Sequence, residues 1–404
     1  MSLAALSQGR ASARAPRLAL DPWLLSAVFA LLLLGLIVVT SASMPFAARK
    51  LGDPFGLVSR QLLFAGLGCV AMLAAFAVRT ELWERAGLFL MLVALGLLVL
   101  VLVPGVGASA NGARRWLSFG FMRFQASELA RLFVLIYLCS YAVRHREELR
   151  NSLRGVFKPL AVLVFAAALM LVEPDMGGAT VLFATGFFVL FIAGLPWKYV
   201  LSSMALGGIA FYAAALGSVY RQKRWDTFLN PWADPEGSGF QLIQSLIAIG
   251  RGEWFGVGLG ASVQKLAYLP EAHTDFVFAV MAEELGLLGV TCVLALYVIV
   301  LWRTTRIANL AAQAGQMFQA YLAGTFGVWL AMQAFINIGV NMGVLPTKGL
   351  TLPLMSYGGT SLLVSLLWLG IVLRIHHECA AAGRLAVPRE IAPRPAATRL
   401  ERAA

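Results

Sequence analysis

Charged side chains are scarce in this sequence: Asp, Glu, Lys and Arg make up 13% of its 404 residues, whereas 60% are hydrophobic. An ordinary soluble domain carries about 25% charged residues, so this composition argues against one. A membrane-spanning helix needs about 20 predominantly apolar residues, and we count about ten such runs. They lie at residues 23–42, 57–78, 86–103, 127–143, 159–172, 178–194, 199–217, 276–302, 319–340 and 352–375. The sequence therefore predicts an all-α polytopic membrane protein, with one transmembrane domain over residues 21–376.

Cysteines are equally scarce. The four in the chain lie far apart and three fall inside apolar runs, which excludes a disulfide framework and a paired-cysteine metal site. His376, His377 and Cys379 cluster after the last run, where a solvated helix end is the more common interpretation. We expect no organic cofactor; a divalent cation could assist an anionic substrate, but no set of metal ligands can be read from the sequence.

The first apolar run is predicted to stay in the mature protein. Ser41, Ala42 and Ser43 resemble a signal-peptide cleavage site. The run before them, however, is longer than the apolar part of a signal peptide, and further runs follow.

Positive charge is distributed unevenly, on a net charge of +12. Arg and Lys gather in the N-terminal tail, in the 144–158 loop, at Arg303 and Arg306, and in the C-terminal tail. By the positive-inside rule these segments face the cytoplasm, together with both termini. No nucleic-acid-binding pattern accompanies the charge. Residues 1–20 and 377–404 are predicted as cytoplasmic tails, with disorder expected over 1–20 and 380–404 from their Ala, Arg and Pro content.

The external loop 104–126 departs from that rule, because it carries Arg114, Arg115 and Arg123 on the disfavoured side. The functional interpretation is an anion site at the outer membrane surface; the plainer one is a loop that tolerates arginine. The next run opens with Glu128 and Arg131, an i,i+3 pair. Since charge is costly inside a bilayer, we expect this pair to face the bundle interior and brace the loop.

A second acidic feature is the turn Glu173-Pro174-Asp175 between the fifth and sixth runs. It could balance the external arginines or face solvent, and the sequence leaves both open.

The external segment 218–275 is the longest polar stretch. It begins with three basic residues within 221–224 and continues to a short amphipathic helix predicted over 240–250. Gln241, Gln244 and Ser245 are placed on one face of that helix, which we expect to lie in the membrane interface and to help close a groove beside Asp275. The alternative is a static cover. Glycines between 250 and 260 would allow the connecting chain to move, although an ordinary loop explains them equally well.

Asp275 ends this segment, with Thr274 as a plausible N-cap of the following apolar helix. A carboxylate at this boundary is either a first-turn acid favoured by the helix dipole or a functional group that meets a polar substrate. Glu283 and Glu284 follow roughly 12–14 Å deeper if the helix is straight. They are therefore predicted to hydrogen-bond across helices rather than to act with Asp275.

Four stretches of this chain resemble the SEDS (shape, elongation, division, sporulation) family. They are NGARRW…RFQASELAR, RWDTFLNPWADPEGSGFQLIQS, GLGASVQKLAYLPEAHTDFVFAVMAEELG and NIGVNMGVLPTKGLTLPLMSYGGTS. The resemblance extends over essentially all ten runs, and the third stretch is closer to the cell-division member than to the elongation member. One departure is QASEL in place of QPAEL, which concerns the entry to the helix at Ser127.

The resemblance implies a peptidoglycan glycosyltransferase of the inner membrane at the division septum. Its substrate would be lipid II, with release of a polyprenyl diphosphate, and its partner a class B penicillin-binding transpeptidase. The family's essential acid falls on Asp275, and two important basic positions fall on Arg115 and Arg123. The position of Arg123, like that of Arg131, is commonly Lys in the family. Further substrate-binding residues are predicted at Lys265, His273, Lys348 and Ser356, and bracing residues at Glu128, Arg131, Glu283 and Glu284.

Charge and resemblance together suggest one reaction: external cations stabilise a departing diphosphate while one carboxylate deprotonates an acceptor hydroxyl. Two rival functions are a lipid II flippase, which would need polar residues along a continuous path, and a non-catalytic scaffold of the division complex. No internal repeat is evident, which disfavours an inverted-repeat transporter.

Overall fold

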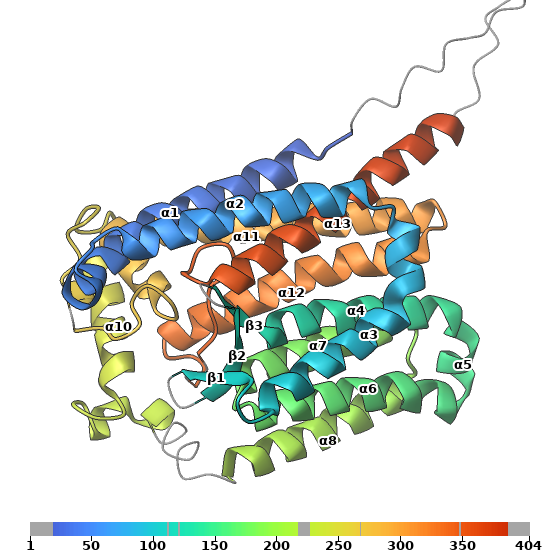
Figure 1. The fold of residues 1–404 in the computed structure, drawn as a ribbon, viewed down its shortest axis with the longest axis horizontal. Helices are drawn as coiled ribbons and strands as arrows, with labels where there is room; N and C mark the ends of the chain where they lie inside the picture. Colours follow the sequence, from blue (N-terminus) through green and yellow to red (C-terminus); the bar gives the residue numbers. More distant parts are fainter. Residues whose placement is uncertain are drawn as a thin grey trace, which may run out of the picture.

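The computed structural model describes residues 19–110, 113–119, 122–216, 227–266, 268–346 and 349–386. Long helices run side by side in one bundle, and shorter elements gather at its ends (Figure 1). The helices are α1 (Pro22–Leu51), α2 (Gly56–Ala77), α3 (Thr80–Leu102), α4 (Ala126–Arg144), α5 (Arg146–Asn151), α6 (Leu153–Val172), α7 (Met176–Ile192), α8 (Trp197–Leu216), α10 (Phe240–Gly252), α11 (Val277–Gln313), α12 (Met317–Asn341) and α13 (Gly359–Ala386). Two 3₁₀ turns are η2 (Pro231–Ala233) and η3 (Gln264–Leu266), and three strands are β1 (Gly107–Ala110), β2 (Ala113–Phe119) and β3 (Met122–Gln125).

Each predicted apolar run lies mostly on one helix, so the helical membrane fold is confirmed. Eight helices in the described part of the chain are long and apolar enough to cross a membrane. The apolar helix α7 has only 17 residues, and α8 does not add to the eight. The count of ten spans, and the domain boundaries, therefore stay predictions.

Local sequence explains several helix ends. The Asp21 side chain accepts a hydrogen bond from the Leu24 amide and caps α1, with Pro22 at the first helical position. Gly52, at a φ of 71°, ends the same helix in the left-handed conformation that glycine adopts without strain. The last helix begins later than predicted: residues 352–358 form turns, and α13 starts at Gly359 and continues to Ala386.

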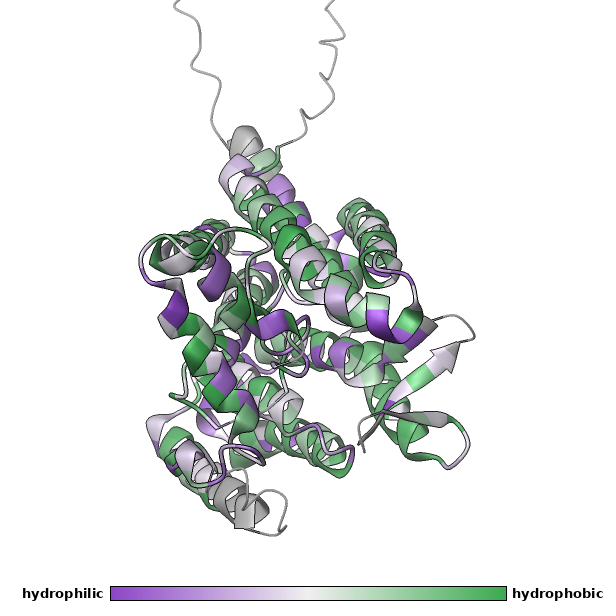
Figure 2. Cartoon of the chain, turned by 90° about the vertical axis from the view of Figure 1, so that its left-hand side faces the viewer, coloured by the Kyte–Doolittle hydropathy of each residue, from purple (hydrophilic) through white to green (hydrophobic). Residues whose placement is uncertain are grey.

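The core lies on α4, α12 and α13. In their most apolar windows, 78%, 72% and 67% of residues are buried, against 28% in α2 and α3, so α2 and α3 are left to face lipid. Trp329 and Trp368 stack with ring centroids 5.1 Å apart at the centre of this core, beside Phe326. Seen along the bundle, hydrophobic residues cover most of the helices (Figure 2).

The external loop that carries the arginines is a small antiparallel sheet in the order β1-β2-β3, which the sequence analysis did not predict. Trp116 pairs with Gln125 and Ser118 with Arg123. Leu117 packs against Val101 at the end of α3 and Ala126 at the start of α4, so the sheet is attached to the bundle by apolar contacts.

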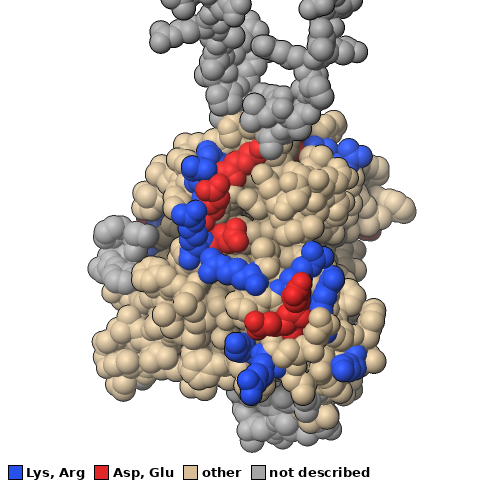
Figure 3. Space-filling model, turned by 90° about the vertical axis from the view of Figure 1, so that its right-hand side faces the viewer, with Lys and Arg blue, Asp and Glu red and all other residues tan. Residues whose placement is uncertain are grey.

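The two ends of the bundle differ. We call the end with the sheet and α10 the sheet end, and the end where the described chain begins and ends the terminal end (Figure 1). Lys and Arg side chains, with interspersed acids, ring the face of the terminal end (Figure 3). Arg303 there pairs with Asp21 at 2.5 Å, which brings the predicted cytoplasmic residues of α11 and the N-terminal segment together. The basic segments that are unevenly spread along the sequence therefore gather at one end of the bundle.

The predicted short helix is present as α10, which lies across the long helices at the sheet end (Figure 1). Ser245 is fully buried and donates a hydrogen bond to the Asn341 carbonyl at 2.8 Å, whereas Ile247 is exposed. The packing of α10 onto α11 and α12 decides which side is inward, and helical periodicity alone does not contain that information.

The helix that follows Asp275 also differs from expectation. The N-cap of α11 is Phe276, not Thr274, whose hydroxyl instead donates to the Glu271 carbonyl at 3.1 Å. Further along, Gly286 has φ 64° and ψ −163°, which interrupts α11. The span that follows Asp275 is therefore not one straight helix, because α11 is interrupted at Gly286.

Candidate active site

Asp275 occupies the last part of a turn that precedes α11 at the sheet end, and its side chain is half-buried. Its backbone carbonyl accepts hydrogen bonds from Asn337 Nδ2 at 2.9 Å and Asn341 Nδ2 at 3.0 Å. The two asparagines are four residues apart on α12, on one face of the helix. A core helix therefore holds the backbone of the predicted catalytic acid.

The Asp275 side chain lines a small cavity of about 40 Å³. The other lining residues are Gln241, Phe276, Asn337, Val340, Gly349 and Leu350. This volume holds water but is far below that of a ligand pocket. Gln241 comes from α10, so the amphipathic helix does lie beside Asp275, as predicted. Whether it gates the site stays a prediction.

The loop before α13 closes the other side of the cavity. A methyl group added at Gly349 would lie 3.4 Å from Asp275 Oδ2, and the φ of Gly349 is +61°. Glycine is therefore required there for the backbone conformation, and it allows the loop to approach the carboxylate. Asn337 Nδ2 also donates to the Leu350 carbonyl at 2.5 Å, so one side chain holds both walls.

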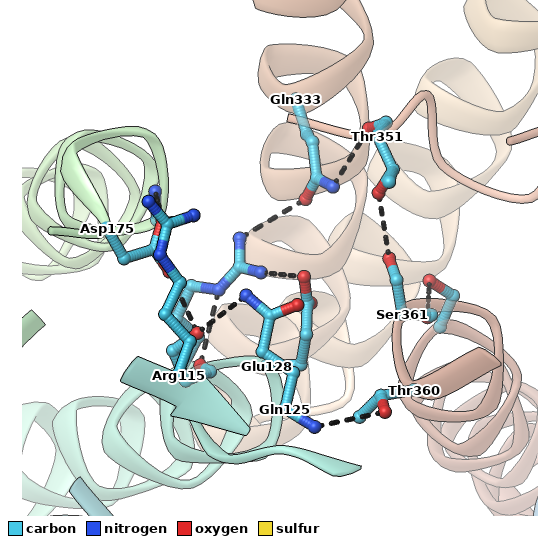
Figure 4. Close-up of polar contacts among 12 residues, drawn as sticks. Arg115, Gln125, Glu128, Asp175, Gln333, Thr351, Thr360 and Ser361 are labelled. Carbon is cyan, nitrogen blue, oxygen red and sulfur yellow. Dashed lines mark hydrogen bonds and ion pairs between the residues drawn. The ribbon is translucent and has the colours of Figure 1, made fainter. Parts of the chain in front are cut away.

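A buried polar network continues from α12 to α4 (Figure 4). Gln333 donates to the Thr351 carbonyl at 3.2 Å and accepts from Arg131 at 3.3 Å. Arg131 is 1% exposed and pairs with Glu128, so the predicted bracing pair does face the bundle interior. Gln125 lies on β3 outside that pair. Its backbone amide donates to the Thr360 hydroxyl at 3.1 Å, which links the sheet to α13.

The acidic turn between α6 and α7 is buried against Arg115 rather than facing solvent. Arg115 donates to the Glu173 and Pro174 carbonyls and lies 3.9 Å from Asp175 Oδ1. Asp175 also accepts a hydrogen bond from Ser127 at 2.8 Å. The structure thus settles the alternative that the sequence left open.

Glu173 itself is fully buried. Burial raises its pKa to about 8, the Asp175 charge adds to the rise, and Arg115 opposes it. At neutral pH the carboxyl of Glu173 is thus mostly protonated.

Arg123 has a different environment. Its side chain is exposed on β3, the strand that leads directly into α4. An exposed guanidinium at the sheet end suits an anionic ligand. The half-buried Arg115, by contrast, is already bound to the 173–175 turn.

The remaining predicted site residues are mostly buried. Lys265 pairs with Glu284 at 2.7 Å, and Glu283 lies 3.2 Å from Arg251, so both glutamates make contacts between segments, as expected. The Ser356 hydroxyl accepts from the Leu352 amide at 2.8 Å and supports the turn before α13.

His273 is 6% exposed and packs between Phe46 and Tyr357, with ring centroids 5.0 and 5.6 Å away. Burial lowers the pKa of His273, against the opposing effect of Glu271, so the ring is neutral at physiological pH. A neutral imidazole does not supply positive charge to an anionic substrate.

Lys348 and the basic residues within 221–224 lie outside the described residues. Within the described ranges, no group of three or more His, Cys, Asp and Glu side chains is arranged to hold a metal ion. The His376 and His377 rings instead contact the backbone of Ala19 at 3.3 and 3.2 Å, near the end of α13.

Comparison with known proteins identifies the family. The family model described as cell cycle protein, FtsW/RodA/SpoVE, matches residues 22–381. The chain belongs to this family. It is 52% identical over 373 residues to a probable peptidoglycan glycosyltransferase FtsW of Thioalkalivibrio sulfidiphilus, covering 92% of each chain. A protein of the same name from Nitrosococcus halophilus is 51% identical over 358 residues, covering 89% of this chain and 92% of the relative.

Solved structures agree with this membership in the FtsW/RodA/SpoVE family. A chain from a study of polymerization and crosslinking by a peptidoglycan synthase complex is 34% identical, with a TM-score of 0.73, covering 90% of this chain and 99% of that one. The rod shape determining protein RodA of Thermus thermophilus is 30% identical, with a TM-score of 0.66, covering 90% and 98%. The bundle described above is thus the fold of these proteins.

Sequence reasoning missed several residues around Asp275 in this family member. It assigned no role to Asn337, Asn341, Gln333 or Gly349. The signal for the asparagines was their i,i+4 spacing, which places both amides on one face. Their target, a backbone carbonyl on a distant segment, is visible only in the folded chain.

Proposed function

We propose that this protein, a peptidoglycan glycosyltransferase, polymerises lipid II with Asp275 as the catalytic base. The observation that carries the proposal is the placement of Asp275: a half-buried carboxylate in a cavity at the sheet end, on backbone held by two asparagines of α12. A rigidly held backbone is what a positioned base requires.

In the proposed step the Asp275 carboxylate removes the proton from a sugar hydroxyl of the acceptor. The acceptor oxygen then attacks the anomeric carbon of the donor. The bond from that carbon to the diphosphate breaks, and the polyprenyl diphosphate leaves with the electron pair. Converting an α-linked donor into a β-linked glycan requires one inversion, which needs a base but no covalent nucleophile.

Cations of the sheet end would stabilise the charge that grows on the departing diphosphate. Arg123 is exposed and suits this role directly. Arg115 holds the 173–175 turn from the adjacent strand β2. Lys348 belongs to this proposal through its sequence position alone.

The setting of the reaction is proposed as well. The basic terminal end would face the cytoplasm and the sheet end the periplasm of the inner membrane, at the division septum. The name of the synthase-complex neighbour joins polymerization to crosslinking, which supports pairing with a class B penicillin-binding transpeptidase.

The test is glycan synthesis by purified protein supplied with lipid II, with and without the transpeptidase and without any other polymerase. We expect Asp275→Ala to lower the rate by about 10²–10⁴-fold, the contribution of a positioned general base. Asp53→Ala is the matched control, because this carboxylate is exposed and accepts a bond from the Phe55 amide in the loop between α1 and α2. Wild-type rates from Asp275→Ala would show that Asp275 is not the base. No glycan from wild type in either condition would favour the flippase or the scaffold.

A further inference from the structure

The segment that leads to Asp275 is anchored by two neighbouring acids of α11. We call residues 268–276 the strap; it lies between the turn η3 and the helix α11 in the chain. Glu283 accepts hydrogen bonds from Ser262 at 2.5 Å and from the Val263 amide at 3.1 Å, just before η3. Glu284, the next residue, binds Lys265 within η3 at 2.7 Å. Both carboxylates therefore hold the turn that precedes the strap.

The Lys265–Glu284 pair also reaches a third element. Ser41 of α1 donates to Glu284 Oε1 at 2.6 Å and accepts from Lys265 Nζ at 2.6 Å. Four residues later in α1, Pro45 lacks the amide that would normally bind the Ser41 carbonyl. The pair therefore joins η3, α11 and α1 at one point.

The backbone of α11 is fixed at the same place. The Glu283 and Glu284 carbonyls accept from the Val257 and Gly258 amides at 2.9 and 3.1 Å. Beyond the interruption at Gly286, the Leu287 and Leu288 amides donate to the Glu253 and Trp254 carbonyls at 2.8 and 3.1 Å. These bonds satisfy the groups that the interrupted helix leaves free, so the two acids stand on a well-defined turn.

Stability alone is a weak explanation for this pair, because burying two charges is costly even when they meet. The side chains of Lys265 and Glu284 are 6% and 0% exposed. Glu284 Oε2 has no hydrogen-bond partner among the described residues, so the cost is only partly offset. Such a pair is better explained by the specific geometry that it imposes.

The strap is held by backbone hydrogen bonds at both of its ends. At its start, the Leu269 amide donates to the Gln264 carbonyl of η3 at 2.9 Å. At its other end, the Tyr357 amide donates to the His273 carbonyl at 2.9 Å, and α12 holds the Asp275 carbonyl. Lys265 and Glu284 do not line the cavity at Asp275.

We propose that the buried Lys265–Glu284 ion pair is a positioning element that holds the strap so that Asp275 points into its cavity. This inference rests on Asp275 being the base proposed above. It assigns Lys265 a role different from the substrate contact predicted from the sequence. Lys265 acts through the backbone between η3 and Asp275 and does not touch the reacting atoms.

The test compares Lys265→Met, the double variant Lys265→Met/Glu284→Gln, and Lys265→Arg. The double variant leaves no unpaired buried charge, so it keeps the test valid if Lys265→Met does not fold. Arg251→Met is the matched control: it breaks the adjacent pair with Glu283, in which Arg251 is 46% exposed and screened by solvent.

Two kinds of measurement are made: steady-state kinetics with lipid II, which give kcat and KM, and hydrogen exchange of the strap amides against those of α4. We expect kcat of the double variant to fall about 10–100-fold, as for a displaced catalytic group, with KM unchanged. Strap exchange should rise while α4 exchange stays the same. Lys265→Arg should recover most of kcat, and Arg251→Met should change neither the kinetics nor the exchange appreciably.

A raised KM at unchanged kcat would overturn the proposal and return Lys265 to substrate binding. Unchanged strap exchange would overturn it too. These outcomes can be distinguished from failure of the proposed function. The proposed function is decided by whether the wild-type protein makes glycan. Hydrogen exchange of the strap is measured without substrate, so it does not depend on that result.

Discussion

Arg115 and Arg123 lie on adjacent strands of one small sheet, yet their side chains have different environments. Arg115 is 24% exposed and donates to carbonyls of the 173–175 turn, whereas Arg123 is exposed on β3. Arg115 thus has a structural role, whereas the guanidinium of Arg123 is accessible to an anion.

At the residue scale we therefore expect the two alanine variants to differ. Arg123→Ala should lower kcat/KM for lipid II and leave the unfolding temperature unchanged. Arg115→Ala should lower both, because losing hydrogen bonds to buried or half-buried carbonyls costs about 1–3 kcal/mol. Turnover and tryptophan-fluorescence melting of purified protein check this, with Arg306→Ala at the terminal end as the control. Equal effects of the two variants on stability would contradict this assignment.

At the scale of elements, the interruption of α11 is the feature that shapes the site. The segment from Val277 to Glu284 is entirely buried, and Leu287 and Leu288 beyond Gly286 are exposed. The interruption therefore separates a buried segment that follows Asp275 from a helix that faces lipid. Only glycine has ready access to the backbone conformation at Gly286.

Gly286→Ala is expected to destabilise the protein by about 1–3 kcal/mol through backbone strain alone. The added methyl group would also lie 2.3 Å from the Gly256 amide nitrogen, so the 253–258 loop would have to shift. Gly96→Ala in α3 is the control, because no atom lies within 4 Å of its added methyl group. Thermal unfolding in detergent measures both; similar unfolding temperatures for the two variants would show that the interruption is not required.

At the scale of the whole molecule, charge and polar function lie at opposite ends. The terminal end carries a ring of basic side chains with interspersed acids (Figure 3). The sheet end carries Asp275, the sheet and α10 (Figure 1). If the positive-inside rule sets the orientation, the sheet end is periplasmic.

Cysteine labelling tests that orientation. In a background with the four native cysteines replaced, we expect Arg60→Cys at the start of α2 to react with a membrane-impermeant maleimide in intact spheroplasts. Arg306→Cys should react only after the membrane is permeabilised. Both side chains are exposed, so accessibility to water within the fold does not separate them. The reverse pattern would invert the proposed topology.

The sequence by itself determined the membrane fold, because a bilayer demands long apolar runs and those runs are a property of the chain alone. It also determined the place of Asp275 at a boundary of one run, the buried pair of Glu128 and Arg131, and the existence of the short helix α10. Each of these follows from local spacing or from the cost of placing charge in lipid.

Only the tertiary structure decided which partners the polar residues have. The sheet at 107–125, the binding of Arg115 to the 173–175 turn, and the pairing of Lys265 with Glu284 and Ser41 join segments far apart in the chain. A side chain at such a position can bind a substrate or a neighbouring segment with the same chemistry. Packing settles the choice, because a buried charge must be matched by whichever group the fold brings within hydrogen-bonding distance.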